Sequence, residues 1–161
     1  MAEVMTGFPA GFMDLALEEA HAAAAEDEVP VGCVIVRDGA VIARGHNRTL
    51  TERDPTAHAE MVALRAAAAS LGGERLIGCD IYVTLEPCTM CAGALSLARI
   101  RRLYYGAADP KGGAVDSGVR FFASPTCHHR PDVYGGIAER EAGALLRAFF
   151  DGLRMKAGRN S

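Results

Sequence analysis

Hydrophobic positions recur at two different spacings along the chain. Four stretches carry apolar residues every three or four positions, which is the spacing of one helical face. These stretches are residues 12–27, 55–71, 87–98 and 137–156. Four shorter runs are rich in β-branched and aromatic residues, which is typical of strands. These runs are residues 31–36, 41–45, 80–85 and 101–106. The pattern predicts an α/β protein.

The connections indicate how the strands pair. Asp38-Gly39 joins the first two strands and is typical of hairpin turns, so we expect antiparallel pairing. The third strand, the helix at 87–98 and the fourth strand follow with short joints, which predicts a βαβ unit with parallel strands. Asp54 or Thr56 can cap the helix at 55–71, and Pro55 suits its first turn.

Composition narrows the class of protein. A chain of 161 residues, half of them hydrophobic, fits one soluble domain. No apolar run reaches the roughly 20 residues of a membrane span. Residues 1–4 lack the features of a signal peptide, so we expect a cytoplasmic protein without a membrane role. Five cysteines, an odd number, argue against a disulfide framework.

Charge is unevenly distributed around a net value of −3. Residues 1–30 hold seven acids and no Lys or Arg, whereas residues 99–130 hold six bases and two acids. The basic segment can hold a phosphate backbone or can simply be a solvated face. The last helix combines a basic end with an apolar stripe formed by Leu145, Leu146, Phe149, Phe150 and Leu153.

Two short segments carry metal-binding chemistry at the starts of predicted helices. Cys88 and Cys91 are three positions apart, so they share one helical face and can hold one ion. A first helical turn also favours thiolate over thiol. With His58 they offer zinc three ligands, which leaves the fourth tetrahedral position to water, as in catalytic zinc sites. Glu60 lies two residues after His58 and can take a proton from that water.

These residues form the pair H-A-E and P-C-x-x-C, the signature of the zinc-dependent nucleobase deaminases. Longer segments resemble the bacterial tRNA-specific adenosine deaminases, and the likeness runs from about residue 10 to about residue 155. The segments are residues 28–32, 45–48, 54–60 and 83–94.

The resemblance and the predicted elements together imply a cytidine deaminase-like fold. We expect a three-layer α/β/α sandwich around a mixed sheet of about five strands, with residues 1–161 forming a single deaminase domain. The resemblance also implies a homodimer with one zinc ion per subunit.

The activity implied is hydrolytic deamination of adenosine to inosine at the wobble position of a tRNA anticodon arm. Glu60 is then the catalytic acid and base, and His58, Cys88 and Cys91 are the zinc ligands. The substrate would be held by Asn47, by backbone near Ala59, by a wall containing Pro30 and Val31, and by Asp109 as an RNA contact. Without the resemblance, Asn47 and Asp109 are ordinary turn residues.

Alternatives remain open on the sequence alone. A deaminase of a free base or nucleoside, of guanine or cytosine type, would use the same zinc chemistry. A non-catalytic RNA-binding subunit would hold zinc structurally and would add a fourth protein ligand. Cys127, His128 and His129 are the candidates for such a ligand, and their roles are not fixed by the pattern.

Overall fold

The structure is a computed structural model that describes residues 9–159. The segment 1–4, in which no signal peptide is expected, lies outside the described residues. In chain order the elements are α1 (Pro9–Ala25), β1 (Gly32–Arg37), β2 (Ala40–His46), α2 (Ala59–Leu71), β3 (Cys79–Leu85), α3 (Thr89–Leu97), β4 (Arg102–Ala107), a short 3-10 helix (Phe121–Ala123), β5 (Asp132–Tyr134) and α4 (Glu139–Arg159).

The strands form one mixed sheet in the order β2-β1-β3-β4-β5. β1 pairs antiparallel with both β2 and β3, while β3, β4 and β5 run parallel. Asp38 and Gly39, in the β1–β2 turn, both have positive φ angles, of 50° and 76°, as a type I′ hairpin requires. The expected hairpin, βαβ unit and mixed sheet are therefore confirmed.

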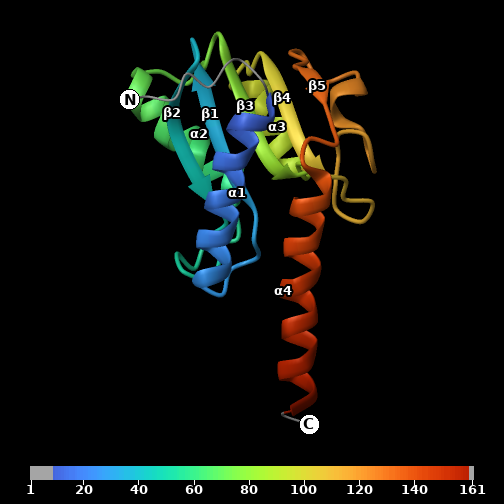
Figure 1. Ribbon diagram of the computed structural model, residues 1–161. Helices are drawn as coiled ribbons and strands as arrows, with labels where there is room; N and C mark the ends of the chain where they lie inside the picture. The colour runs from blue at the N-terminus through green and yellow to red at the C-terminus, as the bar shows by residue number, and fades with distance from the viewer. Residues whose placement is uncertain (1–8, 160–161) are drawn as a thin grey trace.

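Helices cover both faces of the sheet. Figure 1 shows α1 and α4 in front of the strands and α2 and α3 behind them. Phe12, Met13 and Ala16 of α1 pack on one face, against Val34 and Tyr82. The opposite face packs against α2 and α3, in a core that includes Ile35, Ile81, Leu103, Ala63, Ala67 and Leu95. This arrangement is the expected three-layer sandwich.

The predicted start of the helix at 55–71 was wrong by about one turn. Asp54 does not cap α2, because its Oδ1 accepts hydrogen bonds from the backbone N and the hydroxyl of Thr56, at 2.8 and 2.7 Å. These bonds close a local turn through Pro55 instead. The helix begins at Ala59, and His58 takes the N-cap position. An Asp side chain can accept a hydrogen bond from the backbone N–H two residues later. This local turn competes with capping of the helix by the same side chain.

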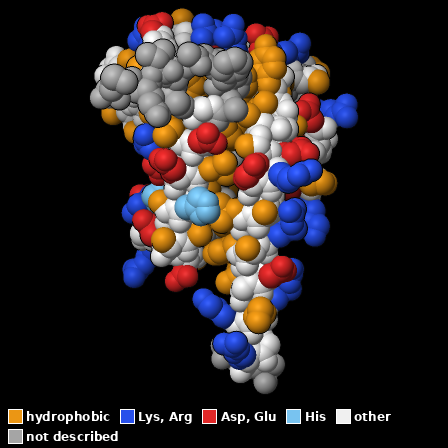
Figure 2. Space-filling view, in the orientation of Figure 1, with side chains coloured by type: hydrophobic (Ala, Val, Ile, Leu, Met, Phe, Trp, Pro, Cys, Tyr) orange, Lys and Arg blue, Asp and Glu red, His pale blue; other side chains and the backbone are white. Residues whose placement is uncertain are grey.

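The last helix is less buried than its apolar stripe suggests. Ala142 is the one residue of α4 that is buried in the described chain, while Phe150 and Leu153 are 42% and 45% exposed. Figure 1 shows the C-terminal half of α4 extending beyond the sheet. Figure 2 shows Lys and Arg side chains along α4 and acidic side chains over α1. Within residues 9–159, no helix is both long and apolar enough to cross a bilayer.

Candidate active site

The starts of α2 and α3 bring together the residues predicted to bind metal. His58 is the N-cap residue of α2 and Cys88 is the N-cap residue of α3. Both have extended backbone, and neither side chain makes a capping hydrogen bond. Their imidazole and thiol face each other instead. Close packing fixes α2 here, because a Cβ at Gly45 of β2 would lie 2.6 Å from the carbonyl oxygen of Ala59.

The three ligand atoms have the spacing of a zinc site. His58 Nδ1 lies 3.5 Å from Cys88 Sγ and 3.6 Å from Cys91 Sγ, and all three atoms lie within 4.8 Å of one another. Zinc bonds of about 2.3 Å to sulfur and about 2.0 Å to nitrogen, at a tetrahedral angle, would separate S and N by about 3.5 Å. Two sulfurs and one imidazole therefore suit one zinc ion.

A fourth protein ligand is not found in the described part of the chain. Cys127 Sγ lies against Ser96 Oγ and the carbonyl oxygen of His129, while His129 Nε2 lies 2.6 Å from the carbonyl oxygen of Ile100. His128 is exposed. These residues hold the chain between the 3-10 helix and β5 and do not join the cluster. The fourth position stays available to water, as a catalytic site requires.

The cluster favours the thiolate form of one cysteine, Cys88. The pKa of Cys88 is lowered to about 4, first by a hydrogen bond with the Cys91 thiol and then by His58. The same bond with Cys88, together with burial, raises the pKa of Cys91. The hydrogen bond with Cys88 raises the pKa of His58. Metal ligands must give up their protons, so a bound cation would replace the protons that these three groups share.

Glu60 lies beside the cluster but is not part of it. It occupies the first turn of α2 and its side chain is buried, with 4% exposure. Burial raises the pKa of this carboxyl group above its ordinary value. A carboxyl group with a raised pKa holds a proton more readily, so it can accept a proton from water and later return it to another group. The arrangement can therefore move protons next to a metal-bound water.

A cavity of about 360 Å³ opens over the cluster. Four residues expected to hold substrate lie in its wall: Val31, Asn47, Ala59 and Asp109. The side-chain amide of Asn47 makes no hydrogen bond with any residue in the described range, so it is free to bind a ligand. Pro30 is buried and is not a lining residue; Val29 takes its place. Other lining residues not anticipated from the sequence are Thr49, Leu85, Glu86 and Gly112.

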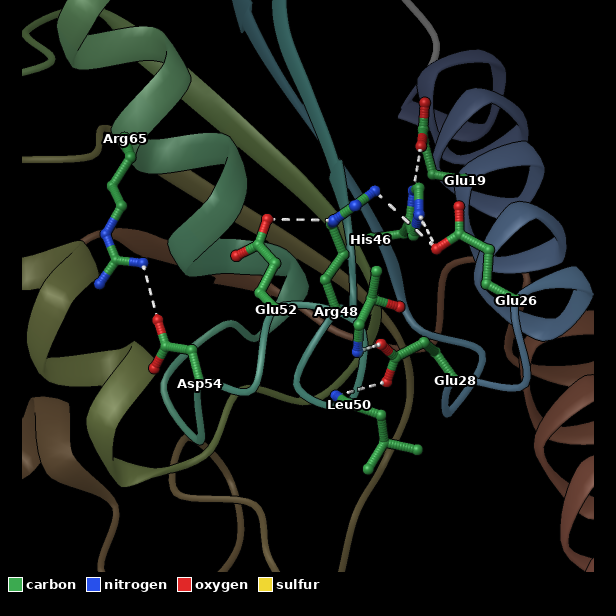
Figure 3. A network of polar contacts seen from close by, with 10 residues as sticks. Glu19, Glu26, Glu28, His46, Arg48, Leu50, Glu52, Asp54 and Arg65 are labelled. Carbon is green, nitrogen blue, oxygen red and sulfur yellow. Dashed lines mark hydrogen bonds and ion pairs between the residues drawn. The ribbon is translucent and has the colours of Figure 1, made fainter.

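Two loops form much of this wall, and buried carboxylates hold them. Glu28 accepts hydrogen bonds from the backbone N of Leu50 and of Thr51, at 3.1 and 2.7 Å (Figure 3). Burial alone would raise the pKa of Glu28, but these bonds lower it below its ordinary value. A signal was present in the sequence, because Glu28 directly precedes the apolar residues 29–31 and Glu86 directly follows the apolar run at 80–85. The partners, more than 20 residues away, could not be found by spacing.

His46, at the end of β2, is bound to α1 and to the turn that follows it. Its Nδ1 lies 2.8 Å from Glu19 and its Nε2 lies 3.2 Å from Glu26 (Figure 3). His46 therefore anchors the start of the Asn47 loop and is not a cavity residue.

Comparison with known proteins places this site in a family. A family model described as the cytidine and deoxycytidylate deaminase zinc-binding region matches residues 9–107, which include the cluster and Glu60. A tRNA-specific adenosine deaminase of Agrobacterium fabrum is 66% identical over 139 residues, which cover 86% of this chain and 91% of the relative. The chain belongs to the tRNA-specific adenosine deaminase family.

Solved structures of deaminases are also similar to this chain. One, from biochemical and structural studies of A-to-I editing by tRNA:A34 deaminases, is 65% identical with a TM-score of 0.84, over 84% of this chain and 99% of that one. A guanine deaminase from Nitrosomonas europaea is 27% identical with a TM-score of 0.72, over 88% of this chain and 84% of that one. The expected family and the cytidine deaminase-like fold are both confirmed.

Proposed function

We propose that this protein converts adenosine to inosine at the wobble position of a tRNA anticodon by zinc-dependent hydrolysis. The observation that carries the proposal is the His58–Cys88–Cys91 cluster beside the buried Glu60. This constellation lies in a chain that is 66% identical to a tRNA-specific adenosine deaminase. The solved relative with a TM-score of 0.84 comes from work on deaminases that act at position 34 of tRNA.

The chain's own residues perform the proton transfers. Zinc held by His58, Cys88 and Cys91 would supply a water with a pKa of about 7. This water is the nucleophile that attacks C6 of the base. Glu60 takes the proton from this water and passes it to the ring nitrogen. It then takes the second proton of the attacking oxygen and delivers it to the amino nitrogen as the C6–N bond breaks, so ammonia leaves, the oxygen stays on C6, and the net reaction consumes water and forms inosine. Such positioned proton transfer contributes about 10²–10⁴ in rate.

The cavity wall orients the base. The free amide of Asn47 binds the polar edge of the ring, together with backbone of Ala59, and Val31 contacts its apolar face. Pro30 lies behind the wall, where its fixed φ angle sets the path of the chain between Val29 and Val31. Asp109, which also lies in the cavity wall, contacts the RNA.

The rest of the anticodon arm lies outside a cavity of this size. A loop nucleotide can enter without the few kcal/mol needed to unstack a duplex base. The exposed bases of α4 give a surface for the phosphate backbone. They are Arg140, Arg147, Arg154, Lys156 and Arg159.

We also infer that residues 1–161 work as one domain, in the cytoplasm, and as a homodimer. Exposed apolar side chains on α3 support the dimer, because Leu97 is 77% exposed and Met90 is 36% exposed. Apolar side chains of this kind are buried in the cores of homodimer interfaces. Sedimentation equilibrium tests this inference, which requires a mass of twice the 17.0 kDa chain.

A deamination assay tests the proposed function. The purified zinc-loaded protein receives an anticodon stem-loop with adenosine at the wobble position and, separately, free adenosine, cytidine and guanine. Inosine and ammonia from the stem-loop alone are the expected result. Turnover of free guanine in place of the stem-loop would favour the second candidate, a free-base deaminase, which the similarity to a guanine deaminase structure supports.

A further inference from the structure

Glu86 is a buried carboxylate that receives an unusual number of hydrogen bonds. Its side chain is 2% exposed and lies between β3 and α3, two residues before Cys88. Oε1 accepts from the backbone N of Asp109 at 3.0 Å and from the hydroxyl of Ser117 at 2.9 Å. Oε2 accepts from three consecutive backbone N atoms at 2.9 to 3.1 Å, those of Val115, Asp116 and Ser117.

These bonds occupy the whole hydrogen-bonding capacity of the carboxylate. Two carboxylate oxygens offer about four lone-pair sites, and Glu86 already receives five donors. Glu86 therefore has no acceptor left for a substrate, although it reaches the cavity wall. Its effect on the cavity must pass through the loop that it holds.

Two backbone hydrogen bonds also fasten the chain here, one to the last residue of β4 just before the loop 109–117 and one within the loop. The backbone N of Glu86 donates to the carbonyl oxygen of Ala107 at 2.8 Å, and Ala114 donates to the carbonyl oxygen of Pro87 at 2.9 Å. The loop brings Asp109 and Gly112 into the cavity wall. One short segment thus carries both the thiol of Cys88 and the carboxylate of Glu86 that anchors the loop 109–117.

Gly113 permits this close approach. A Cβ at this position would lie 2.5 Å from Cδ of Glu86 and 2.6 Å from the carbonyl oxygen of Asp109. Only a residue without a side chain lets the backbone wrap around the carboxylate. A long glycine-containing loop loses much conformational entropy when it is ordered, so it needs a strong fixed anchor.

We propose that Glu86 is a positioning residue that fixes the loop 109–117 as the substrate-binding wall, at a set distance from the metal cluster. The substrate side of this proposal rests on the proposed function, with the wobble nucleotide as the ligand of the wall. The acceptors of Glu86 are already occupied by the loop, and Glu86 is not part of the metal cluster. It determines where Asp109 and Gly112 meet the RNA.

The principal test is Glu86→Gln, which keeps the shape but turns one acceptor oxygen into an NH₂ group facing backbone N–H donors. We expect zinc content to stay at one per chain. We expect KM for the stem-loop to rise about 10-fold or more with kcat within about twofold, because the wall binds substrate while Glu60 remains in place. Amide hydrogen exchange at residues 115–117 should become about 10-fold faster or more, with residues 63–67 of α2 unchanged.

Asp80→Asn is the matched control. Asp80 is a buried carboxylate at the other end of β3, where it accepts two hydrogen bonds from Arg101, at 2.9 and 2.8 Å. This variant should lower the unfolding midpoint while leaving KM and the exchange of residues 115–117 at wild-type values. Comparing the two variants distinguishes the effect of a lower stability from the effect of a displaced cavity wall.

Ser117→Ala is a milder second variant in case Glu86→Gln does not fold or loses zinc. It removes one donor of five, and KM should rise about two- to threefold with zinc retained. Unchanged exchange at residues 115–117 in Glu86→Gln would overturn the proposal, whatever the substrate. So would a lowered midpoint with unchanged KM in the folded fraction. If the wild type acts only on a free base, the proposed function fails, and KM is then measured on that base.

Discussion

The reacting groups and the cavity wall are held in different ways. His58, Glu60 and Cys88 lie at the starts of helices that pack on the sheet, so close packing fixes them. The wall residues Asn47 and Asp109 lie on loops, which Glu28 and Glu86 hold through hydrogen bonds to backbone N–H groups. In the proposed function, the chemistry depends on the first region and the choice of substrate on the second. Changes in the two regions should therefore have separable effects on kcat and KM.

The largest effect should come from removing a metal ligand. Cys91 is fully buried in the cluster, and Cys91→Ala leaves two ligands. We expect zinc affinity to fall by more than about 100-fold, since changes even beyond the ligands cost 10- to 100-fold. Deamination should be lost with it. Metal analysis after dialysis measures this, with Cys79→Ala, a buried cysteine outside the cluster, as the control. Full zinc content in Cys91→Ala would remove Cys91 from the ligand set.

Changing Glu60 should abolish proton transfer without releasing zinc. In Glu60→Gln the side chain keeps its size but cannot carry a proton between water and base. We expect kcat to fall by about 10²–10⁴, with zinc content and KM close to wild type. Steady-state kinetics on the stem-loop, together with metal analysis, measure both. Turnover at the wild-type rate would refute the role given to Glu60.

A change at Asn47 should affect binding more than folding. The amide has no hydrogen-bond partner within residues 9–159, so Asn47→Ala should leave the unfolding midpoint near the wild-type value. Loss of its bonds to the base should lower kcat/KM about 5- to 150-fold, the effect of about 1–3 kcal/mol. Thermal unfolding and kinetics measure the two effects. A large stability loss with unchanged kcat/KM would assign Asn47 to the loop alone.

The smallest effect on catalysis should come from Glu28→Gln, which loosens the other wall loop. We expect a few-fold rise in KM and a loss of stability of about 1–3 kcal/mol at pH 7, because buried backbone donors lose a charged partner. The pKa of Glu28 is lowered in the folded state, so its stabilisation exists above the unfolded pKa, about 4.3, and disappears as pH falls through the folded value.

The difference in unfolding midpoint between wild type and Glu28→Gln should therefore be full at pH 7 and shrink below about pH 4. Thermal unfolding followed by circular dichroism across this range measures it. A difference that stays constant down to pH 3 would mean that Glu28 acts through its shape and not through its charge.

Much of the reacting centre could be predicted because its information is local. The spacing of Cys88 and Cys91 follows from one helical turn, and His58 and Glu60 form the H-A-E motif. The structure brings the ligand atoms of His58, Cys88 and Cys91 within 4.8 Å of one another, and His58, Glu60 and Cys88 line one cavity. The short strand β5 had no such signal. Three residues are too few to show a period, and they form a strand only because β4 offers an open edge.

The sequence by itself determined the family, the order of helices and strands, and the types of residue at the metal cluster. Only the tertiary structure decided that Asp54 closes a turn before α2, that Val29 rather than Pro30 lines the cavity, and that much of the apolar stripe of α4 stays exposed. The tertiary structure likewise gave Glu86 its partners, 23 to 31 residues further along the chain. Local spacing determines which side chains share a helical face, whereas these contacts depend on which distant segments of the chain the fold brings together.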